Sequence, residues 1–370
     1  MIYLDYGATS WPKPVSVRRS VDRAISRYGN PGRGGYPAAM EAAQAVYRCR
    51  ERAAKLFHCQ PEQVVFTMNC THGLNMAINT LIPPGGRVVI SGFEHNAVTR
   101  PLWALGAGIE VVGRKLFDPT DTLQTAERVL KTHPDGAVFT HVSNVFGYIL
   151  PIEELAALCR QYDVPFVVDA AQSAGTLPLD FAALGADFVA MPGHKGLQGP
   201  MGTGLLLCGR VPKPLLSGGT GSMSEIQQMP DFLPDRAEAG TMNVPGICGL
   251  SAALELVSRR NLQETARREA WLTKVAAQGL SAMGLRVFSG EPQSGTCSFL
   301  PPDDDGEAAA ERLARRGFCL RAGLHCAPLA HESAGTLQTG TLRLSCGPET
   351  RLWQIQHFLQ AAGDTFSERP

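Results

Sequence analysis

Seven short apolar runs, separated by stretches of helical spacing, fill the first two thirds of the chain and restrict its fold more than any other feature. The runs lie at residues 63–67, 87–90, 109–112, 136–140, 165–169, 187–190 and 204–208. Between them, residues 73–81 and 153–162 carry apolar side chains at every third or fourth position, which is typical of helices that cover a sheet. This repeated order predicts an α/β fold with a mainly parallel sheet and helices on both faces.

The pattern changes after residue 214. A glycine-rich loop at 217–222 leads to a long helical segment that we predict at 246–283. Beyond it we expect a smaller α+β domain, built from a helix at 306–316, strands at 318–321 and 341–345, and a closing helix. We place the large domain at residues 13–254 and the small domain at residues 1–12 and 255–370.

Composition excludes several classes of protein. The chain has 370 residues, of which 44% are hydrophobic, so it can bury a large core. Its 34 basic residues balance 34 acidic ones, and we therefore expect no nucleic-acid partner. No apolar stretch reaches the roughly 18 residues of a membrane span, and the N-terminus does not resemble a secretory leader, so we expect a cytoplasmic protein with no membrane partner. The ten cysteines show no zinc spacing, and we expect no metal site and mostly buried thiols.

Polar residues follow two of the predicted strands, at the sheet edge where parallel sheets bind ligands. The turn at 69–73 opens a helix whose first amides suit an anion, although this turn taken alone favours an ordinary helix cap by Asn69 or Thr71. Asp169 ends another strand, where a buried carboxylate needs a partner. A helix cap and a counter-ion for a protonated ring nitrogen remain alternatives for Asp169.

Lys195 is poorly placed for a solvated surface lysine, because glycines flank the His194-Lys195 pair at the end of an apolar strand. An amine that is desolvated near another cation has a lowered pKa and is suited to a Schiff base. Together with Asp169 on the preceding strand, Lys195 meets the needs of a pyridoxal phosphate site.

Cys326 lies beside a histidine in a loop bounded by glycine and proline, between Arg321 and Arg343. Such a loop is accessible, and a nearby cation favours the thiolate. Of the ten cysteines, this is the one for which we expect a chemical role.

With these motifs the chain resembles the cysteine desulfurase and selenocysteine lyase family, class V of the fold-type I pyridoxal phosphate enzymes. The matching segments follow the family's order and lie at residues 4–10, 94–96, 143–147, 169–173, 193–195, 238–241, 321–328 and 342–345. The resemblance implies a large α/β domain that binds pyridoxal 5'-phosphate and a smaller domain that carries the cysteine loop.

The resemblance also implies roles in cofactor binding. Lys195 would form the Schiff base and move the substrate Cα proton, and His95 would stack over the ring. Asp169 would pair with the pyridinium nitrogen, and Gln172 would bond the ring oxygen. Other implied cofactor contacts are Asn144, Cys70, Thr71, His194 and, from a second subunit, Thr241. A homodimer with shared active sites follows from the last of these.

Further implied roles concern the substrate, L-cysteine or L-selenocysteine. Arg343 and Asn144 would fix its carboxylate, with Arg321 and Arg33 at the mouth of the site and Arg33 reaching across the dimer. Cys326 would take the sulfur as a persulfide, leaving alanine. The compact cysteine loop resembles the branch that passes its sulfur to an acceptor protein.

Three positions depart from the family pattern: Pro192 replaces a hydroxyl residue, Cys70 a threonine and Leu324 a histidine. They concern phosphate binding and the surroundings of Cys326. Selenocysteine lyase shares every matched residue and is the main alternative, whereas a class V aminotransferase needs no thiol. A nicotinamide oxidoreductase would need a glycine fingerprint that the 69–73 turn lacks, and a non-catalytic binding module leaves the matched residues unexplained.

Overall fold

All seven predicted strands form, and they lie side by side in one sheet. The computed structural model describes residues 1–32, 34–303 and 305–367. The strands, in chain order, are β2 (Val64–Thr67), β3 (Arg87–Ser91), β4 (Gly108–Val112), β5 (Gly136–Thr140), β6 (Phe166–Asp169), β7 (Phe188–Pro192) and β8 (Gly204–Cys208). Their order across the sheet is β2-β8-β7-β6-β5-β3-β4, and β8 alone runs in the opposite direction to the other six. The predicted mainly parallel sheet is therefore confirmed.

Both faces of this sheet are buried, as expected for a sheet built from strand-helix-strand units. Successive residues of β3 alternate between two hydrophobic clusters: Val88 and Ile90 face one, and Val89 faces the other. Helices α3 (Cys70–Leu81) and α4 (Asn96–Ala104) pack on the face with Val88 and Ile90 and contribute residues to that cluster. The opposite face is covered by helices that include α2 (Pro37–Phe57), α5 (Pro119–Leu130), α6 (Ile152–Gln161) and α8 (Val244–Ser258). The shorter α7 (Phe181–Leu184) adds to this layer, and α1 (Val15–Arg27) packs mainly on α8.

A second lobe holds a smaller antiparallel sheet with strand order β12-β13-β10-β9. Its elements are β9 (Arg286–Phe288), β10 (Thr296–Leu300), β12 (Arg321–Gly323), β13 (Thr341–Ser345), α9 (Leu262–Ala282), α10 (Gly306–Arg315) and α12 (Leu352–Ser367). Helix α11 (Pro328–Ala334), between β12 and β13 in the chain, packs on the large lobe. Residues of β13 alternate here too. Leu342 and Leu344 enter the core formed with α9, α10 and α12. Arg343 points the other way and contacts Asn144 of the large lobe.

The N-terminus of the chain belongs to this second lobe. Strand β1 (Ile2–Tyr3) pairs in parallel with β11 (Phe318–Cys319), and Leu4 lies in the small-lobe core. The next residues lead toward the large lobe, because Ser10 N donates to His194 O at 3.0 Å. The first ten residues therefore bridge the two lobes beside the Lys195 segment.

Two predicted elements are wrong in detail. The helix predicted at 246–283 is two helices, because α8 ends at Ser258 and α9 begins at Leu262, where the Asn261 side chain caps it by accepting from Glu264 N. The strand predicted at 318–321 is split between β11 and β12, which lie in different sheets.

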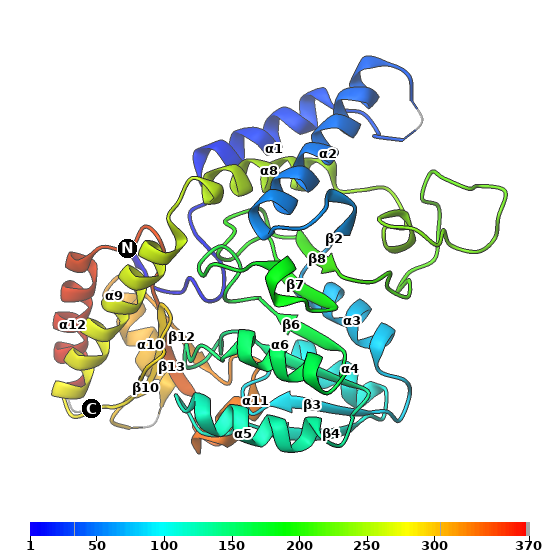
Figure 1. Ribbon diagram of the computed structural model, residues 1–370. Helices are drawn as coiled ribbons and strands as arrows, with labels where there is room; N and C mark the ends of the chain where they lie inside the picture. The colour runs from blue at the N-terminus through cyan, green and yellow to red at the C-terminus, as the bar shows by residue number, and fades with distance from the viewer. Residues whose placement is uncertain (33, 304, 368–370) are drawn as a thin grey trace.

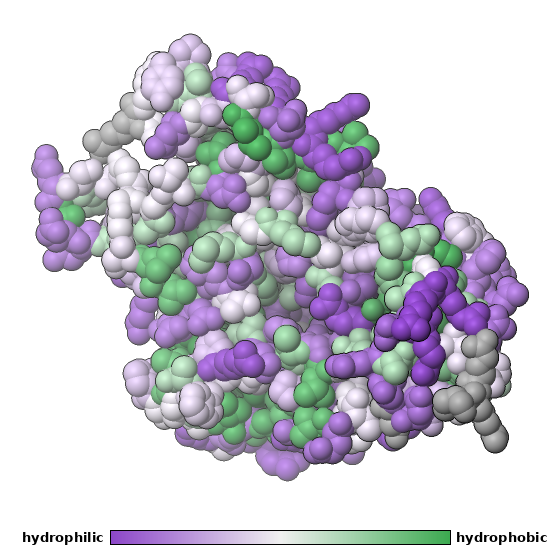
Figure 2. All heavy atoms as spheres, turned by 180° about the vertical axis from the view of Figure 1, so that it is seen from behind, coloured by the Kyte–Doolittle hydropathy of each residue, from purple (hydrophilic) through white to green (hydrophobic). Residues whose placement is uncertain are grey.

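No helix within the described residues is both long and apolar enough to cross a membrane. Figure 2 shows apolar side chains interspersed with polar ones over the back of the molecule.

Candidate active site

A pocket lies at the carboxyl ends of the parallel strands, where the sheet rule predicts it. Its cavity volume is about 110 Å³. Eight predicted site residues line it together: Cys70, Thr71, His95, Asn144, Asp169, Gln172, His194 and Lys195. Residues far apart in the sequence thus meet because their strands end at one edge.

Asp169 ends strand β6 and is in register with Ala190 of the neighbouring parallel strand β7, and Lys195 lies on the loop that follows β7. Removal from water and the nearby Arg343 guanidinium lower the pKa of Lys195. A larger fraction of this amine is therefore neutral and nucleophilic than for a lysine in water.

One oxygen of the Asp169 carboxylate is held by two donors. Asp169 Oδ1 accepts from Ala171 N at 2.9 Å and from the Cys70 thiol at 3.3 Å. Asp169 itself lines the pocket, and its Oδ2 has no such partner among the described residues. The Cys70 and Ala171 donors thus fix the carboxylate and leave Oδ2 for a ligand.

His95 caps helix α4, because its Nδ1 accepts from Ala97 N at 2.9 Å. Burial lowers the pKa of His95, so the ring is neutral at pH 7 and carries its proton on Nε2. The pKa of His194 falls to about 4 through burial and the nearby Lys195 and Lys13. Its Nδ1 lies 3.1 Å from Thr9 Oγ1.

Helix α3 opens at the pocket, and Asn69, rather than Thr71, caps it by accepting from His72 N at 2.9 Å. Thr71 is exposed and lines the pocket with Cys70. A helix N-terminus of this kind favours an anionic group such as phosphate.

Gln172 lines the same pocket and also holds the N-terminal segment. Its Nε2 donates to Gly7 O at 3.0 Å. The amide therefore joins the large lobe to the residues that precede helix α1.

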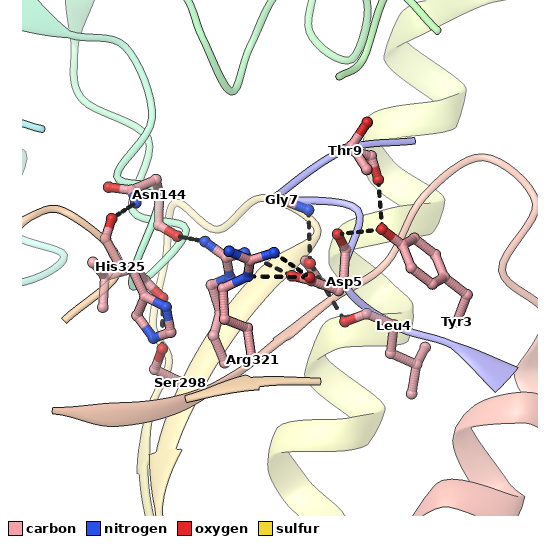
Figure 3. A network of polar contacts seen from close by, with 12 residues as sticks. Tyr3, Leu4, Asp5, Gly7, Thr9, Asn144, Ser298, Arg321 and His325 are labelled. Atoms are coloured by element: carbon pink, nitrogen blue, oxygen red, sulfur yellow. Dashed lines mark hydrogen bonds and ion pairs between the residues drawn. The ribbon is translucent and has the colours of Figure 1, made fainter. Parts of the chain in front are cut away.

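Arg343 and Arg321 do not line the pocket; instead, both bind Asp5, a residue that sequence reasoning did not single out (Figure 3). Arg343 is 2% exposed, and its guanidinium donates to Asp5 Oδ1 at 2.7 Å and to Asn144 O at 3.0 Å. Arg321 donates to Asp5 Oδ2 at 3.1 Å. The only sequence signal for Asp5 is its place in the matched 4–10 segment.

Cys326 is the one exposed cysteine of the ten, and its loop is held on several sides. The Cys326 carbonyl accepts from Asn96 N at 2.7 Å, and the His325 carbonyl accepts from Asn144 Nδ2 at 2.8 Å. His325 Nε2 lies 3.2 Å from Thr341 O, and burial lowers the pKa of His325 to about 2. The neutral ring therefore donates to this carbonyl, and the loop is fixed to the pocket wall.

Two predicted site residues stand apart. Thr241 lines a different hollow, beside Met68 and Met242, and not the Lys195 pocket of its own chain. Arg33 lies outside the described residues.

The chain is similar to known proteins over nearly its whole length. The aminotransferase class-V family model matches residues 2–358. The chain is 30% identical to a probable cysteine desulfurase of Methanothermobacter thermautotrophicus, covering 99% of the chain and 94% of the relative, and 30% identical to one of Pyrococcus abyssi, covering 97% and 92%.

Solved structures agree with these sequence matches. The apo cysteine desulfurase of Thermococcus onnurineus superposes with a TM-score of 0.91 at 28% identity, covering 100% of this chain and 95% of that one. A cysteine desulfurase of Escherichia coli in an S-sulfonic acid form gives 0.85 at 26% identity, covering 99% and 94%. The expected fold-type I architecture is confirmed.

Proposed function

The chain belongs to the aminotransferase class-V family and matches its cysteine desulfurases from end to end, and on that premise we propose that it is a pyridoxal 5'-phosphate-dependent cysteine desulfurase. It converts L-cysteine to L-alanine and carries the released sulfur on Cys326 as a persulfide. The relatives reported above are desulfurases, so selenocysteine lyase is the less favoured alternative.

The pocket fits the cofactor. Asn144 Oδ1 is buried there without a hydrogen-bond partner among the described residues, so the pocket holds polar capacity that the protein does not use itself. Lys195 offers an amine with a lowered pKa, and Asp169 offers a free carboxylate oxygen. When bound, the cofactor supplies an electron sink for the carbanion formed at the substrate Cα.

Each part of the cofactor would be bound by particular residues of the pocket. Asp169 would pair with the ring nitrogen, Gln172 and Asn144 would bind ring substituents, and neutral His95 would stack on the ring. The phosphate would be held by His194 and the start of α3 at Cys70 and Thr71, since Pro192 lacks a side-chain donor.

The chain's own residues then perform the reaction. Arg343, with Asn144, binds the substrate carboxylate, and Lys195 accepts the Cα proton. The Cys326 thiolate attacks the substrate sulfur, so an S–S bond forms as the C–S bond breaks. The electron pair of the C–S bond stays on carbon, Cβ takes up a proton, and Lys195 returns a proton to Cα to give alanine. The exchange is balanced and needs no external oxidant.

One observation carries this proposal: the only exposed cysteine is fixed to the pocket that holds Lys195. Asn144 lines that pocket and binds the loop at His325, and Asn96, which binds Cys326 O, directly follows His95. An aminotransferase has no use for a thiol held in this place.

We also propose that two chains share their active sites. Thr241 lies away from the pocket of its own chain, which is the placement needed for a contribution to the partner's phosphate site. Arg33 would reach the partner's site mouth in the same dimer. An exposed persulfide at Cys326 suits transfer to an acceptor protein, and the cytoplasmic location stays a prediction.

A single-turnover experiment tests the function. The yellow holoenzyme is mixed with L-cysteine, and alanine and the mass of the Cys326 peptide are measured for the native sequence and Cys326→Ala. We expect one alanine per site and a gain of one sulfur on Cys326, with neither product in the variant. Alanine release from selenocysteine alone, equal in both proteins, would point to a lyase. A protein that stays colourless after incubation with the cofactor would refute both readings.

A further inference from the structure

A buried carboxylate is shared by two arginines at the edge of the pocket. Asp5 is 7% exposed, and each of its oxygens accepts from a different guanidinium, Oδ1 from Arg343 and Oδ2 from Arg321. Figure 3 shows the Arg321 guanidinium directed toward Asp5. Two cations and one anion leave a single net positive charge in the cluster.

The N-terminal segment is shaped to place Asp5 there. A Cβ on Gly7 would lie 3.1 Å from Arg343 Cζ, so a side chain at this position would press on the guanidinium and shift it by a few tenths of an ångström. Gly7 N donates to Ser345 Oγ at 2.8 Å, and Tyr3 Oη donates to Asp5 O at 3.1 Å. The carboxylate is thus held by contacts on both sides of it in the chain.

The charges of this cluster act on Lys195 and Asn144 in the pocket. Arg343 lowers the pKa of Lys195, and it also bonds the backbone of Asn144, which lines the pocket. Arg343 Nε is buried and has no hydrogen-bond partner among the described residues, so the guanidinium keeps a donor for a ligand. The Arg321 side chain is 53% exposed and continues the cluster toward solvent.

We propose that Asp5 is a specificity-determining residue: an internal carboxylate that occupies the place a second anionic group of a substrate would take. The proposal rests on the proposed function, in which Arg343 binds the substrate carboxylate. Two unshared guanidinium groups would suit an amino acid with two anionic groups. With Asp5 between them, only one positive charge remains, and a second anion would be brought toward a like charge. The site therefore selects amino acids with one carboxylate, such as cysteine and alanine.

A purely structural role for Asp5 makes a different prediction. If Asp5 only holds the N-terminal segment in place, its replacement weakens every amino acid ligand by the same factor. If it fills an anion site, its replacement changes the ranking of ligands. The ratio of two dissociation constants separates these cases, because losses common to both ligands cancel.

The test measures binding of L-alanine, L-aspartate, L-glutamate and L-cysteate through the visible absorbance change of the holoenzyme. We compare the native sequence with Asp5→Asn, which removes the charge at similar shape, and Asp5→Glu, which keeps it. The ratio compared is the dissociation constant of a doubly anionic ligand divided by that of alanine. In Asp5→Asn we expect this ratio to fall by at least about tenfold for one or more of the doubly anionic ligands, since an arginine freed from Asp5 can form a charge-assisted hydrogen bond with the second anionic group. Asp5→Glu and the exposed control Glu110→Gln should keep the native ratio.

A second variant keeps the proposal falsifiable if Asp5→Asn does not fold. Arg321→Gln alters a half-exposed side chain and leaves Asp5 paired with Arg343 alone, so the cluster has no net charge. We expect alanine to bind about tenfold more weakly, with doubly anionic ligands still excluded. Unchanged alanine binding in Arg321→Gln, or an unchanged ratio in folded Asp5→Asn, would overturn the inference. Persulfide formation on Cys326 in the native protein separates this failure from failure of the proposed function.

Discussion

Cys70 and Cys326 belong to the two lobes, and the protein surrounds the same thiol in opposite ways. Cys70 opens helix α3 and is buried, and both burial and the Asp169 carboxylate raise its pKa well above the usual value. Its thiol donates to Asp169 and stays protonated. Cys326 is exposed on a loop whose backbone is tied to the pocket wall. One sulfur thus acts as a hydrogen-bond donor, and the other is available as a nucleophile.

The two regions control their reactive groups by different means. Interior groups such as Lys195, Asp169 and Cys70 obtain their properties from burial, because low polarity magnifies each neighbouring charge. The Cys326 loop obtains its properties from position, with both His325 and Cys326 held at positive φ, 50° and 56°. Such backbone persists only where the surroundings fix it, and here hydrogen bonds from Asn96 and Asn144 do so.

The largest effect is expected in the interior. Lys195→Ala removes the amine proposed to anchor the cofactor and to move the Cα proton, so alanine release should fall by at least about 10⁴-fold and the yellow colour should disappear. Absorbance spectra and alanine assays measure both. Lys131→Ala, which alters an exposed lysine paired with Glu127, serves as the control. A Lys195→Ala protein that stays active would show that the pocket is not the reacting site.

The contrast between the two thiols can be measured directly. We expect iodoacetamide to modify Cys326 at least about 10³-fold faster than Cys70 in the folded protein, because one is exposed and the other is buried, protonated and hydrogen-bonded. Mass spectrometry of peptides gives both rates. Denaturant should make the two rates similar. Comparable rates in the folded protein would contradict the division between the lobes.

The buried carboxyl group of Glu94 should make the stability of the protein depend on pH. Glu94 precedes His95, and burial raises the pKa of its carboxyl from 4.5 to about 8. The folded state then holds a proton that the unfolded state loses above pH 4.5, so stability falls as the pH rises from about 4.5 to 8. Glu94→Gln removes this term. As the pH rises from 5 to 8, the free energy of unfolding of Glu94→Gln should increase relative to that of the native protein by on the order of 3 kcal/mol, measured by urea titration. Parallel pH profiles would contradict the assignment.

Much of the large lobe could be predicted from sequence, because buried parallel strands are continuous apolar runs bounded by polar turns. The strands at 136–140 and 204–208 have the predicted bounds. The smaller sheet was harder: β10 has Ser298 facing the large lobe, where its Oγ donates to Val145 O, so its pattern is broken by polar residues. The break between α8 and α9 was missed because apolar spacing continues across it, and Asn261 is its main local signal.

The candidate site shows the same limit. Residues that follow strands, such as Asp169 and Lys195, could be placed together because the sheet brings strand ends to one edge. Asp5 could not, since its partners Arg321 and Arg343 are more than three hundred residues away and meet it only through tertiary packing. Thr241 could be placed in a site only through a resemblance that implies a second chain.

A smaller effect is expected from loosening the cysteine loop. His325→Ala removes the contact with Thr341 O, and the freed loop should slow persulfide formation by about 10- to 100-fold while the cofactor spectrum is unchanged. His325→Gln can still donate to this carbonyl and should recover part of the rate. Rapid-quench measurement of alanine and the spectrum together separate the loop from the pocket. Loss of colour in His325→Ala would show that the two regions are not independent.

The smallest effect is expected at Cys70, where the chemistry of one atom can be changed almost without changing its shape. Cys70→Ser replaces a weak thiol donor with a stronger hydroxyl donor, so Asp169 should become a weaker base toward the ring nitrogen. We expect alanine release to fall about two- to fivefold, with a shift in the pH dependence of the visible absorbance, whereas Cys70→Ala should shift that pH dependence in the opposite direction. A role in packing alone would change stability in both variants and leave the absorbance titration unmoved. Opposite shifts would establish that the buried Cys70 thiol tunes Asp169, the carboxylate proposed to pair with the cofactor ring.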